Sequence, residues 1–423
     1  MFKKRSTGHG SKATLMQNTV MLYILTFSNY FLGLIVAPYE TRVLGPQVYG
    51  TLGAATAVMV YFQLFIDFGF LLSGTQEVAV HRSNTTQLRR IFTAVTSAKL
   101  ILTAISVVLL VIACNVIPAW EGRLGFFFLF FLGTAANSMI PDYLYRGMER
   151  MSAITLRTVC IKVFFTVGIL LFLKTPEDVW KVPAITALGN FIAMGYSYYD
   201  LHRRFGIRFC RISWRDVADT VRRSAVFFYS RIATTAYSAL NTVILDMISA
   251  SGAPTSFYTS ADKLITTGKS ALTPISDSLY PYMVKHRDFK LAKKVLLVLE
   301  PLIVVFCGIF FIWAEPLCAL IFGADFAPAG QVLRAMLPVG VVILPSYILG
   351  FPMMSAMGIA QHANYSVIFG SCMQMVNLLV LYLTGNINMV TLGITVSITE
   401  TLILLYRIVA IWLHRDLLRK GRD

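Results

Sequence analysis

A polar stripe runs along the apolar segment 255–280, where polar residues recur at spacings of three and four. Its members are Tyr258, Asp262, Thr266, Lys269, Thr273 and Ser276. Residues at this spacing share one face of an α-helix. Charged groups on a membrane-spanning helix are costly, and they mark either a transport pathway or a buried ion pair. The stripe, with the adjacent Lys263, is therefore the first candidate surface for binding a polar, charged ligand.

Three other segments carry polar residues at similar spacings. They are Arg231, Thr234, Ser238 and Asn241 in 224–248, Thr56, Gln63 and Asp67 in 48–72, and Asn18, Thr26 and Asn29 in 15–37. In each half of the chain, the first two helices are thus the polar ones. This symmetry predicts a water-filled central cavity shared by two lobes.

The carboxylates of Asp67, Asp246 and Glu400 stand in apolar segments and are candidates for ion coupling. A structural alternative stays open, in which Arg231, Asp262 and Lys269 form buried ion pairs and Asp67 and Arg231 extend to the cytoplasmic surface. Arg407 and Asp277 lie near helix ends and are expected to be interfacial.

These residues are embedded in a dozen long apolar stretches. Only 14% of the chain is charged, whereas soluble chains carry about 25% charged residues. Crossing a bilayer takes about 20 apolar residues in a helix. We expect an all-α integral membrane protein with about 12 transmembrane helices. The expected ranges are 15–37, 48–72, 92–113, 124–145, 154–173, 181–199, 224–248, 255–280, 291–313, 332–357, 363–383 and 389–412.

The basic residues test this count, because Lys and Arg concentrate in the cytoplasmic loops of membrane proteins. With the amino terminus inside, 26 Lys and Arg fall in cytoplasmic segments and 5 fall on the opposite side. Both termini are therefore predicted to be cytoplasmic.

The longest polar segment, 200–223, divides six helices from six. We expect a six-helix lobe at 1–199, a basic cytoplasmic linker at 200–223 and a second six-helix lobe at 224–423. A weak internal repeat supports two lobes, because the stretch 44–50 (LGPQVYG) and the stretch 251–254 (SGAP) open corresponding helices. Transporters built from such repeats bind substrate where the repeats meet.

Enzymatic signals are weak. The six His residues form no paired metal-binding spacing, the six Cys residues are scattered, and no Gly-rich phosphate loop precedes a helix. We expect no catalytic residues, no metal, no cofactor and no nucleic-acid partner.

Four stretches resemble the O-antigen (Wzx-type) polysaccharide repeat-unit flippases of the multidrug/oligosaccharidyl-lipid/polysaccharide exporter superfamily. They are 37–46 (APYETRVLGP) with Tyr49-Gly50, 67–79 (DFGFLLSGTQEVA), 141–151 (PDYLYRGMERM) and 322–326 (FGADF). Tyr143 stands where such proteins often have Trp, and Arg146 where many have Gln.

The resemblance implies transfer of undecaprenyl-diphosphate-linked oligosaccharide from the cytoplasmic to the periplasmic leaflet by alternating access, for surface polysaccharide. It also implies a bacterial inner-membrane location, contact with membrane lipids, and polysaccharide polymerase and chain-length proteins as candidate partners. Cationic lumen residues are a family trait, and the matching candidates are Arg42, Arg231, Lys263 and Lys269. Together with Asp262, Asn241, Tyr258 and Thr266, these form the expected substrate-binding set.

Two other functions stay open. A cation-coupled multidrug exporter of the same superfamily would have carboxylates dominating its cavity, whereas here Arg and Lys oppose Asp262 and Asp246. A membrane polymerase or ligase acting on lipid-linked glycans would need a large external catalytic loop, and no such loop is evident in the sequence.

Overall fold

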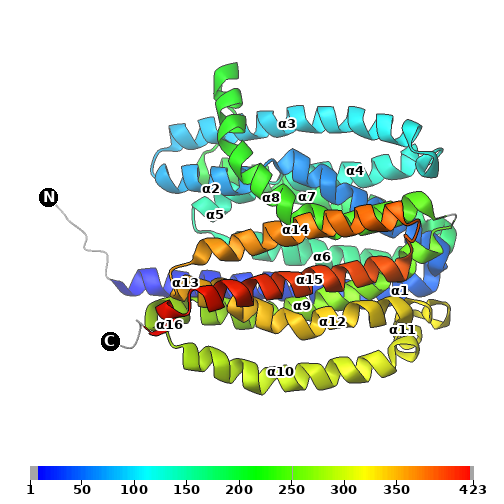
Figure 1. Ribbon diagram of the computed structural model, residues 1–423. Helices are drawn as coiled ribbons and strands as arrows, with labels where there is room; N and C mark the ends of the chain where they lie inside the picture. Colours follow the sequence, from blue (N-terminus) through cyan, green and yellow to red (C-terminus); the bar gives the residue numbers. More distant parts are fainter. Residues whose placement is uncertain (1–7, 250, 420–423) are drawn as a thin grey trace. The chain divides into compact units, whose positions relative to one another are not determined.

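The computed structural model describes residues 8–249 and 251–419, with side chains outside the described set at 8–20, 22–27, 29–31, 230, 233–238, 418 and 419. Every regular element among the described residues is a helix (Figure 1). The expectation of an all-α membrane protein is confirmed.

The chain divides into two compact units. Unit 1 comprises Met1–Val36 and Val58–Ile232, and unit 2 comprises Ala37–Ala57 and Ala233–Asp423. Two long helices, α1 (Gly8–Asp67) and α8 (Trp214–Ile248), contribute residues to both units. The expected division into a lobe at 1–199, a linker at 200–223 and a lobe at 224–423 stays a prediction.

Helix α1 consists of two helical stretches that meet at a kink at Gly45, with φ 68° and ψ 171°. The kink lies inside the expected boundary between residues 37 and 48, where a loop was expected and the chain is instead helical on both sides of Gly45. A positive φ is accessible to glycine at little cost, and the following Pro46 has no N–H to donate to the helix. The apolar run therefore bends at Gly45 instead of ending there.

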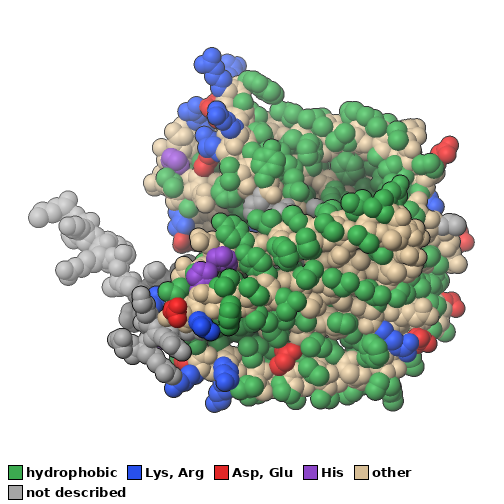
Figure 2. Space-filling view, in the orientation of Figure 1, with side chains coloured by type: hydrophobic (Ala, Val, Ile, Leu, Met, Phe, Trp, Pro, Cys, Tyr) green, Lys and Arg blue, Asp and Glu red, His purple; other side chains and the backbone are tan. Residues whose placement is uncertain are grey.

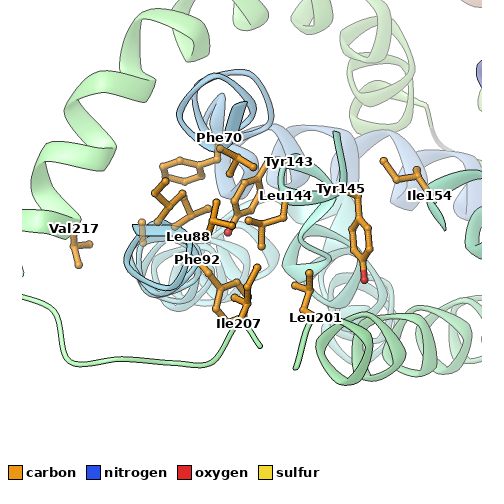
Figure 3. Packing of buried hydrophobic residues seen from close by; sticks show 14 of the residues in the cluster. Phe70, Leu88, Phe92, Tyr143, Leu144, Tyr145, Ile154, Leu201, Ile207 and Val217 are labelled. Carbon is orange, nitrogen blue, oxygen red and sulfur yellow. The ribbon is translucent and has the colours of Figure 1, made fainter. Parts of the chain in front are cut away.

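Among its described residues, unit 1 contains six further helices and two 3₁₀ turns. They are α2 (Phe70–Val80), α3 (Thr85–Val116), η1 (Pro118–Trp120), α4 (Leu124–Met139), α5 (Asp142–Gly147), α6 (Met151–Phe172), η2 (Pro176–Trp180) and α7 (Lys181–Phe205). Helix α7 packs against α4 and α6, and α2 packs against α5. Figure 3 shows the core of this unit, in which Phe70, Tyr143 and Leu144 lie beside Leu88 and Phe92.

Unit 2 is organised around α12 (Ala329–Leu349), which packs against α9 (Ala253–His286), α10 (Phe289–Ile312) and α15 (Met389–Leu413). The remaining elements are α11 (Ala314–Phe322), η3 (Ala324–Phe326), α13 (Phe351–Ala356), α14 (Ala360–Leu383) and α16 (Asp416–Arg419). Helix α14 packs along α15, which places polar residues of α9, α14 and α15 within one unit.

Local chemistry accounts for several helix boundaries. The Asn84 side chain accepts the Gln87 N–H at 3.1 Å and caps α3, and Asn388 caps α15 in the same way. Helix α7 ends at Gly206, whose φ of 62° is left-handed. At the start of α8, the N–H of Ser213 and the guanidinium of Arg90 hold the pKa of the Asp216 carboxyl below its usual range.

The expected segments 124–145 and 332–357 correspond to the candidate membrane spans Leu124–Gly147 and Ala329–Ala356. Each span has an internal break, at Ile140 and Pro141 between α4 and α5, and at Gly350 between α12 and α13. Helix α11 was not expected at all. The segment 200–223 is largely helical, because α7 continues to Phe205 and α8 begins at Trp214.

Among the described residues, eight helical segments are long and apolar enough to cross a membrane. The number of about twelve crossings stays a prediction. Helix α10 has the highest hydropathy of these segments and the lowest buried share. It exposes large apolar side chains along its length, including Leu297, Leu302 and Val305. Figure 2 shows the hydrophobic side chains along it. A helix that exposes such side chains is suited to contact with lipid tails.

Candidate functional site

The polar stripe of α9 meets a carboxylate of α15 within unit 2. Lys269 Nζ donates a hydrogen bond to Glu400 Oε1 at 2.6 Å. The Glu400 side chain is 6% exposed and the Lys269 side chain is 25% exposed, so the lysine is the more accessible partner of the pair. The sequence analysis assigned Lys269 to the substrate-binding set and Glu400 to the candidates for ion coupling. The two residues stand 131 positions apart, so helix periodicity gave no sign of their contact.

Closer to the start of α9 on the same stripe, Thr266 Oγ1 donates to Asp262 Oδ2 at 3.5 Å. Lys269 is close enough to Asp262 to attract it electrostatically. The α9 stripe thus holds one ammonium that faces two carboxylates, Asp262 and Glu400.

Lys263, Glu40 and Tyr49 form a second charged group in unit 2. Lys263 donates a side-chain hydrogen bond to the Tyr49 hydroxyl, and the Glu40 carboxylate attracts the same ammonium. Glu40 is buried. Neither Glu40 nor Tyr49 was among the expected site residues, although both lie in stretches that carry the family resemblance.

Arg42 is exposed, and its Nη2 donates to the Leu320 carbonyl at 2.6 Å. Leu320 lies in the last turn of α11, whose final carbonyls have no partner within the helix. Arg42 therefore stabilises a helix C-terminus, where a cation is favoured.

A buried hydrogen-bond network connects four helices of unit 2. Asn241 Nδ2 donates to the Tyr258 hydroxyl at 2.8 Å. Gln374 Nε2 donates to Asn241 Oδ1 and to Thr395 Oγ1, both at 3.1 Å, and Thr399 Oγ1 donates to Gln374 Oε1 at 2.6 Å. All five side chains are buried. The network ends beside Glu400, so it fixes the backbone that presents this carboxylate to Lys269.

Asn241 and Tyr258 were expected in the substrate-binding set and lie in this network, whereas the other three members were not among the expected site residues. Gln374, Thr395 and Thr399 are polar residues inside otherwise apolar helices, a signal that was available. None of the three side chains carries a formal charge, so each stood out less in the sequence than a charged residue in an apolar helix does.

In unit 1, the expected coupling residue Asp67 contacts a lysine. Lys99 Nζ donates to Asp67 Oδ1 at 2.9 Å and also to the Ser138 carbonyl. The Lys99 side chain is 7% exposed. Asp67 is therefore held at the end of α1 by a buried cation from α3.

The remaining expected residues lie on α8. Arg231 is half-buried and Asp246 is buried. The side chains of Thr234 and Ser238, and those of Asn18, Thr26 and Asn29 on α1, lie outside the described residues.

Arg407, which was expected at the membrane interface from its place near a helix end, is buried among helices of unit 2. Its guanidinium donates to the Ser346 carbonyl, to Ser346 Oγ at 2.8 Å and to Ser366 Oγ at 2.9 Å. It connects α15 to α12 and α14.

The fold resembles that of known transporters. The lipid II flippase MurJ, in an inward closed conformation, superposes with a TM-score of 0.69 at 10% identity, over 94% of this chain and 87% of that chain. An inward-facing multidrug resistance MATE family transporter of the MOP superfamily gives 0.71 at 14% identity, over 96% and 99%. At these identities the likeness concerns the fold.

Sequence comparison decides the family. A family model described as "Polysaccharide biosynthesis protein" matches residues 15–287. The chain belongs to this polysaccharide biosynthesis family. Two curated relatives, both called "Putative O-antigen transporter", come from Escherichia coli (strain K12) and Shigella dysenteriae. They are 25% and 22% identical, over 93% and 94% of this chain and 95% and 100% of their own lengths. The family resemblance read from the sequence is confirmed.

Proposed function

We propose that this member of the polysaccharide biosynthesis family is a flippase in the bacterial inner membrane. It moves undecaprenyl-diphosphate-linked oligosaccharide repeat units from the cytoplasmic to the periplasmic leaflet by alternating access, for O-antigen-like surface polysaccharide. The observation that carries the proposal is the match to two O-antigen transporter relatives along more than nine-tenths of the chain.

The chemistry of unit 2 supports an anionic, glycan-bearing substrate. A diphosphate needs cations, and a sugar needs hydroxyl and amide partners in a wet space. Lys269, Lys263 and Arg42 supply positive charge, and the α9 stripe adds the hydroxyl of Thr266 beside Asp262. We assign substrate contact to Lys269 first, because its side chain is partly exposed while that of its carboxylate partner is buried.

The multidrug-exporter alternative is disfavoured by the surroundings of the carboxylates. A site for cationic drugs needs carboxylates that are available to the drug. Asp67 contacts Lys99, Glu400 contacts Lys269, and Glu40 is attracted to Lys263. The enzyme alternative is disfavoured because both curated relatives are named as transporters.

Deletion of this gene in its native host tests the proposed function. We expect loss of surface polysaccharide and accumulation of lipid-linked oligosaccharide that a membrane-impermeant glycosidase cannot reach from outside. Expression of the chain should restore both, as should the control variant Arg123→Gln, which changes an exposed cation at the start of α4. Unchanged polysaccharide in the deletion strain, together with new sensitivity to cationic dyes, would instead support drug export.

Orientation in the membrane gives a separate prediction. The asymmetry of 26 to 5 Lys and Arg places both termini and the segment 200–223 in the cytoplasm. Single cysteines at Ser213 and Ser251, both exposed, should respond differently to an impermeant thiol reagent in intact cells. We expect Ser251→Cys to be labelled and Ser213→Cys to be protected until the cells are opened. The reverse pattern contradicts this topology.

A further inference from the structure

Two histidines of unit 2 meet where α14 begins and α15 ends. His362 lies in the first turn of α14, and His414 directly follows the last residue of α15. Their ring centres are 5.3 Å apart, and their ring planes are inclined at 54°. In Figure 2, His side chains gather at the surface near the beginning of α14. The packing of two helices forms this pair, so no spacing in the sequence could reveal it.

Hydrogen bonds decide which nitrogen of each ring is available to a ligand. His414 Nδ1 lies 2.8 Å from the Ala410 carbonyl oxygen. A carbonyl only accepts, so Nδ1 carries the proton and Nε2 carries the lone pair of the neutral ring. His362 Nδ1 lies 3.2 Å from the Tyr406 hydroxyl oxygen, which can accept the Nδ1 proton in the same way. These contacts leave the Nε2 atom of each ring as the nitrogen that can bind a ligand.

The arrangement is typical of histidines that bind a metal ion. A metal-binding imidazole almost always donates its other N–H to a carbonyl, a carboxylate or water, which orients the ring. When two imidazoles bind one zinc ion at about 2.0–2.1 Å and a tetrahedral angle, their ring centres are about 5 Å apart. The 5.3 Å between the rings of His362 and His414 agrees with this value.

Packing holds the two histidines in this arrangement. Ala363, next to His362, and Ala410, one turn before His414, are buried in the same apolar cluster. Tyr406, whose hydroxyl contacts His362, packs against this cluster too. A site held by packed helices loses little conformational freedom when it binds its ligand.

The surroundings of the pair are suitable for a hydrated cation. Both histidines are half-buried, so an ion can reach them from solvent. The guanidinium of the adjacent Arg415 lies over the Trp412 ring, 5.3 Å from its centroid. Asp416, exposed at the start of α16, adds a carboxylate to the same segment.

The number of protein ligands sets the type of site. Among the residues that the structure describes, no group of three or more His, Cys, Asp and Glu side chains is placed to hold a metal ion. Structural zinc sites have four protein ligands. A site of two histidines would leave the other coordination positions to water, so we expect it to bind its metal reversibly.

We propose that His362 and His414 form a binding site for a divalent transition-metal ion, with zinc as the first probe. The ion would join the beginning of α14 to the end of α15. Imidazole suits zinc, copper and nickel, whereas magnesium prefers oxygen ligands. The sequence predicted no metal because its histidines show no paired spacing. The proposal does not depend on the proposed flippase function.

Isothermal titration calorimetry of the purified full-length protein with zinc chloride in a neutral detergent tests the proposal. The protein carries no polyhistidine tag, and every version has Cys160→Ser and Cys372→Ser, because these exposed thiols could also bind zinc. We expect saturable binding of zinc and a higher melting temperature with it, since a ligand of the folded state stabilises that state. Magnesium chloride at the same concentration should give neither effect.

The decisive variant is His362→Gln with His414→Gln, which keeps polar side chains at both positions. We expect its zinc affinity to fall at least tenfold. His286→Gln is the matched control, because His286 Nδ1 also lies near a carbonyl, 3.2 Å from that of Tyr282, and its ring stacks on Tyr282. This control should bind zinc as the unaltered protein does. If the double variant does not fold, the single variants His362→Gln and His414→Gln serve for the same measurement.

Tyr406→Phe tests the orienting role of the hydroxyl. This variant keeps both imidazoles and the aromatic ring, and it removes the acceptor for His362 Nδ1. Loss of such a partner typically weakens metal binding about 10–100-fold. We expect zinc affinity to fall about tenfold, whereas a merely structural role would lower the melting temperature without zinc and leave the affinity unchanged.

Unchanged zinc affinity in the double histidine variant overturns the proposal, as does an equal loss of affinity in His286→Gln. Absence of zinc binding by the unaltered protein overturns it as well. The titration involves no transport. Its outcome is therefore separate from that of the gene deletion, which tests the proposed flippase function.

Discussion

The double variant Lys269→Met with Glu400→Gln is expected to reach normal abundance in the membrane and to remain defective in glycan export. The pair joins Lys269 Nζ to Glu400 Oε1 at 2.6 Å, and the carboxylate is 6% exposed. Replacing both charges with neutral side chains of similar size leaves no stranded charge at Glu400, and Asp262 keeps the hydrogen bond from Thr266 Oγ1. Such replacements of an ion pair are often neutral for stability. An export defect in this variant therefore reports a need for the ammonium itself.

The single variant Lys269→Met separates the two roles of the lysine. It strands the Glu400 carboxylate, and breaking a fully buried pair costs about 3–5 kcal/mol. We expect a smaller loss here, because the Lys269 side chain is 25% exposed. Membrane abundance should fall in the single variant and recover in the double variant. Surface polysaccharide and protein level are measured in parallel in the deletion strain.

Full export by the double variant would contradict substrate contact by Lys269 and leave the pair as a structural feature. A charge reversal adds a control. The variant Lys269→Glu with Glu400→Lys restores an ion pair with the two charges exchanged, so we expect membrane abundance to recover. The exchange moves the ammonium away from the substrate, so we expect no recovery of export.

The second large effect is expected from Gly50→Ala. A Cβ atom at Gly50 would stand 1.8 Å from the Gly252 carbonyl oxygen, and one at Gly252 would stand 2.2 Å from the Gln47 carbonyl oxygen. Both contacts are with backbone, which cannot rotate away as a side chain can. Overpacking a tight core costs about 1–3 kcal/mol even when side chains adjust, so we expect at least the upper end of this range.

Gly308→Ala is the matched control, since a Cβ at Gly308 meets nothing within 4 Å and the residue lies inside α10. An alanine inside a helix is favoured over glycine by about 0.5–1 kcal/mol. Thermal unfolding in detergent and membrane abundance should therefore fall sharply for Gly50→Ala and hold or rise for Gly308→Ala. Equal behaviour of the two variants would contradict the close backbone approach at Gly50.

Gly50 and Gly252 also show how far sequence reasoning reached. Both stretches were identified as a weak internal repeat, from the letters around Gly45-Pro46 and Gly252-Ala253-Pro254. The repeat indicated that the two segments open corresponding helices. It could not indicate that their backbones touch within unit 2, because a contact between distant segments leaves no mark on the local pattern of either.

The charged residues show the same limit: the sequence identifies candidate residues but not their contacts. Lys269, Glu400 and Asp67 were singled out from the sequence as costly charges in apolar helices, and each is in contact with an opposite charge. The burial of Arg407 was not foreseen, because nearness to a helix end is read along one helix, whereas burial depends on the neighbouring helices. Its partners Ser346 and Ser366 come from two other helices.

The sequence by itself determined that this is a helical membrane protein, because the bilayer imposes one solution on any chain that crosses it. Every backbone group must be satisfied within a helix, and apolar length shows where helices lie. Only the tertiary structure decided which charge meets which. Lys269 and Glu400 are 131 residues apart, and Asn241 and Gln374 are 133 apart. Packing between helices brings such residues together, and helix periodicity carries no information about that packing.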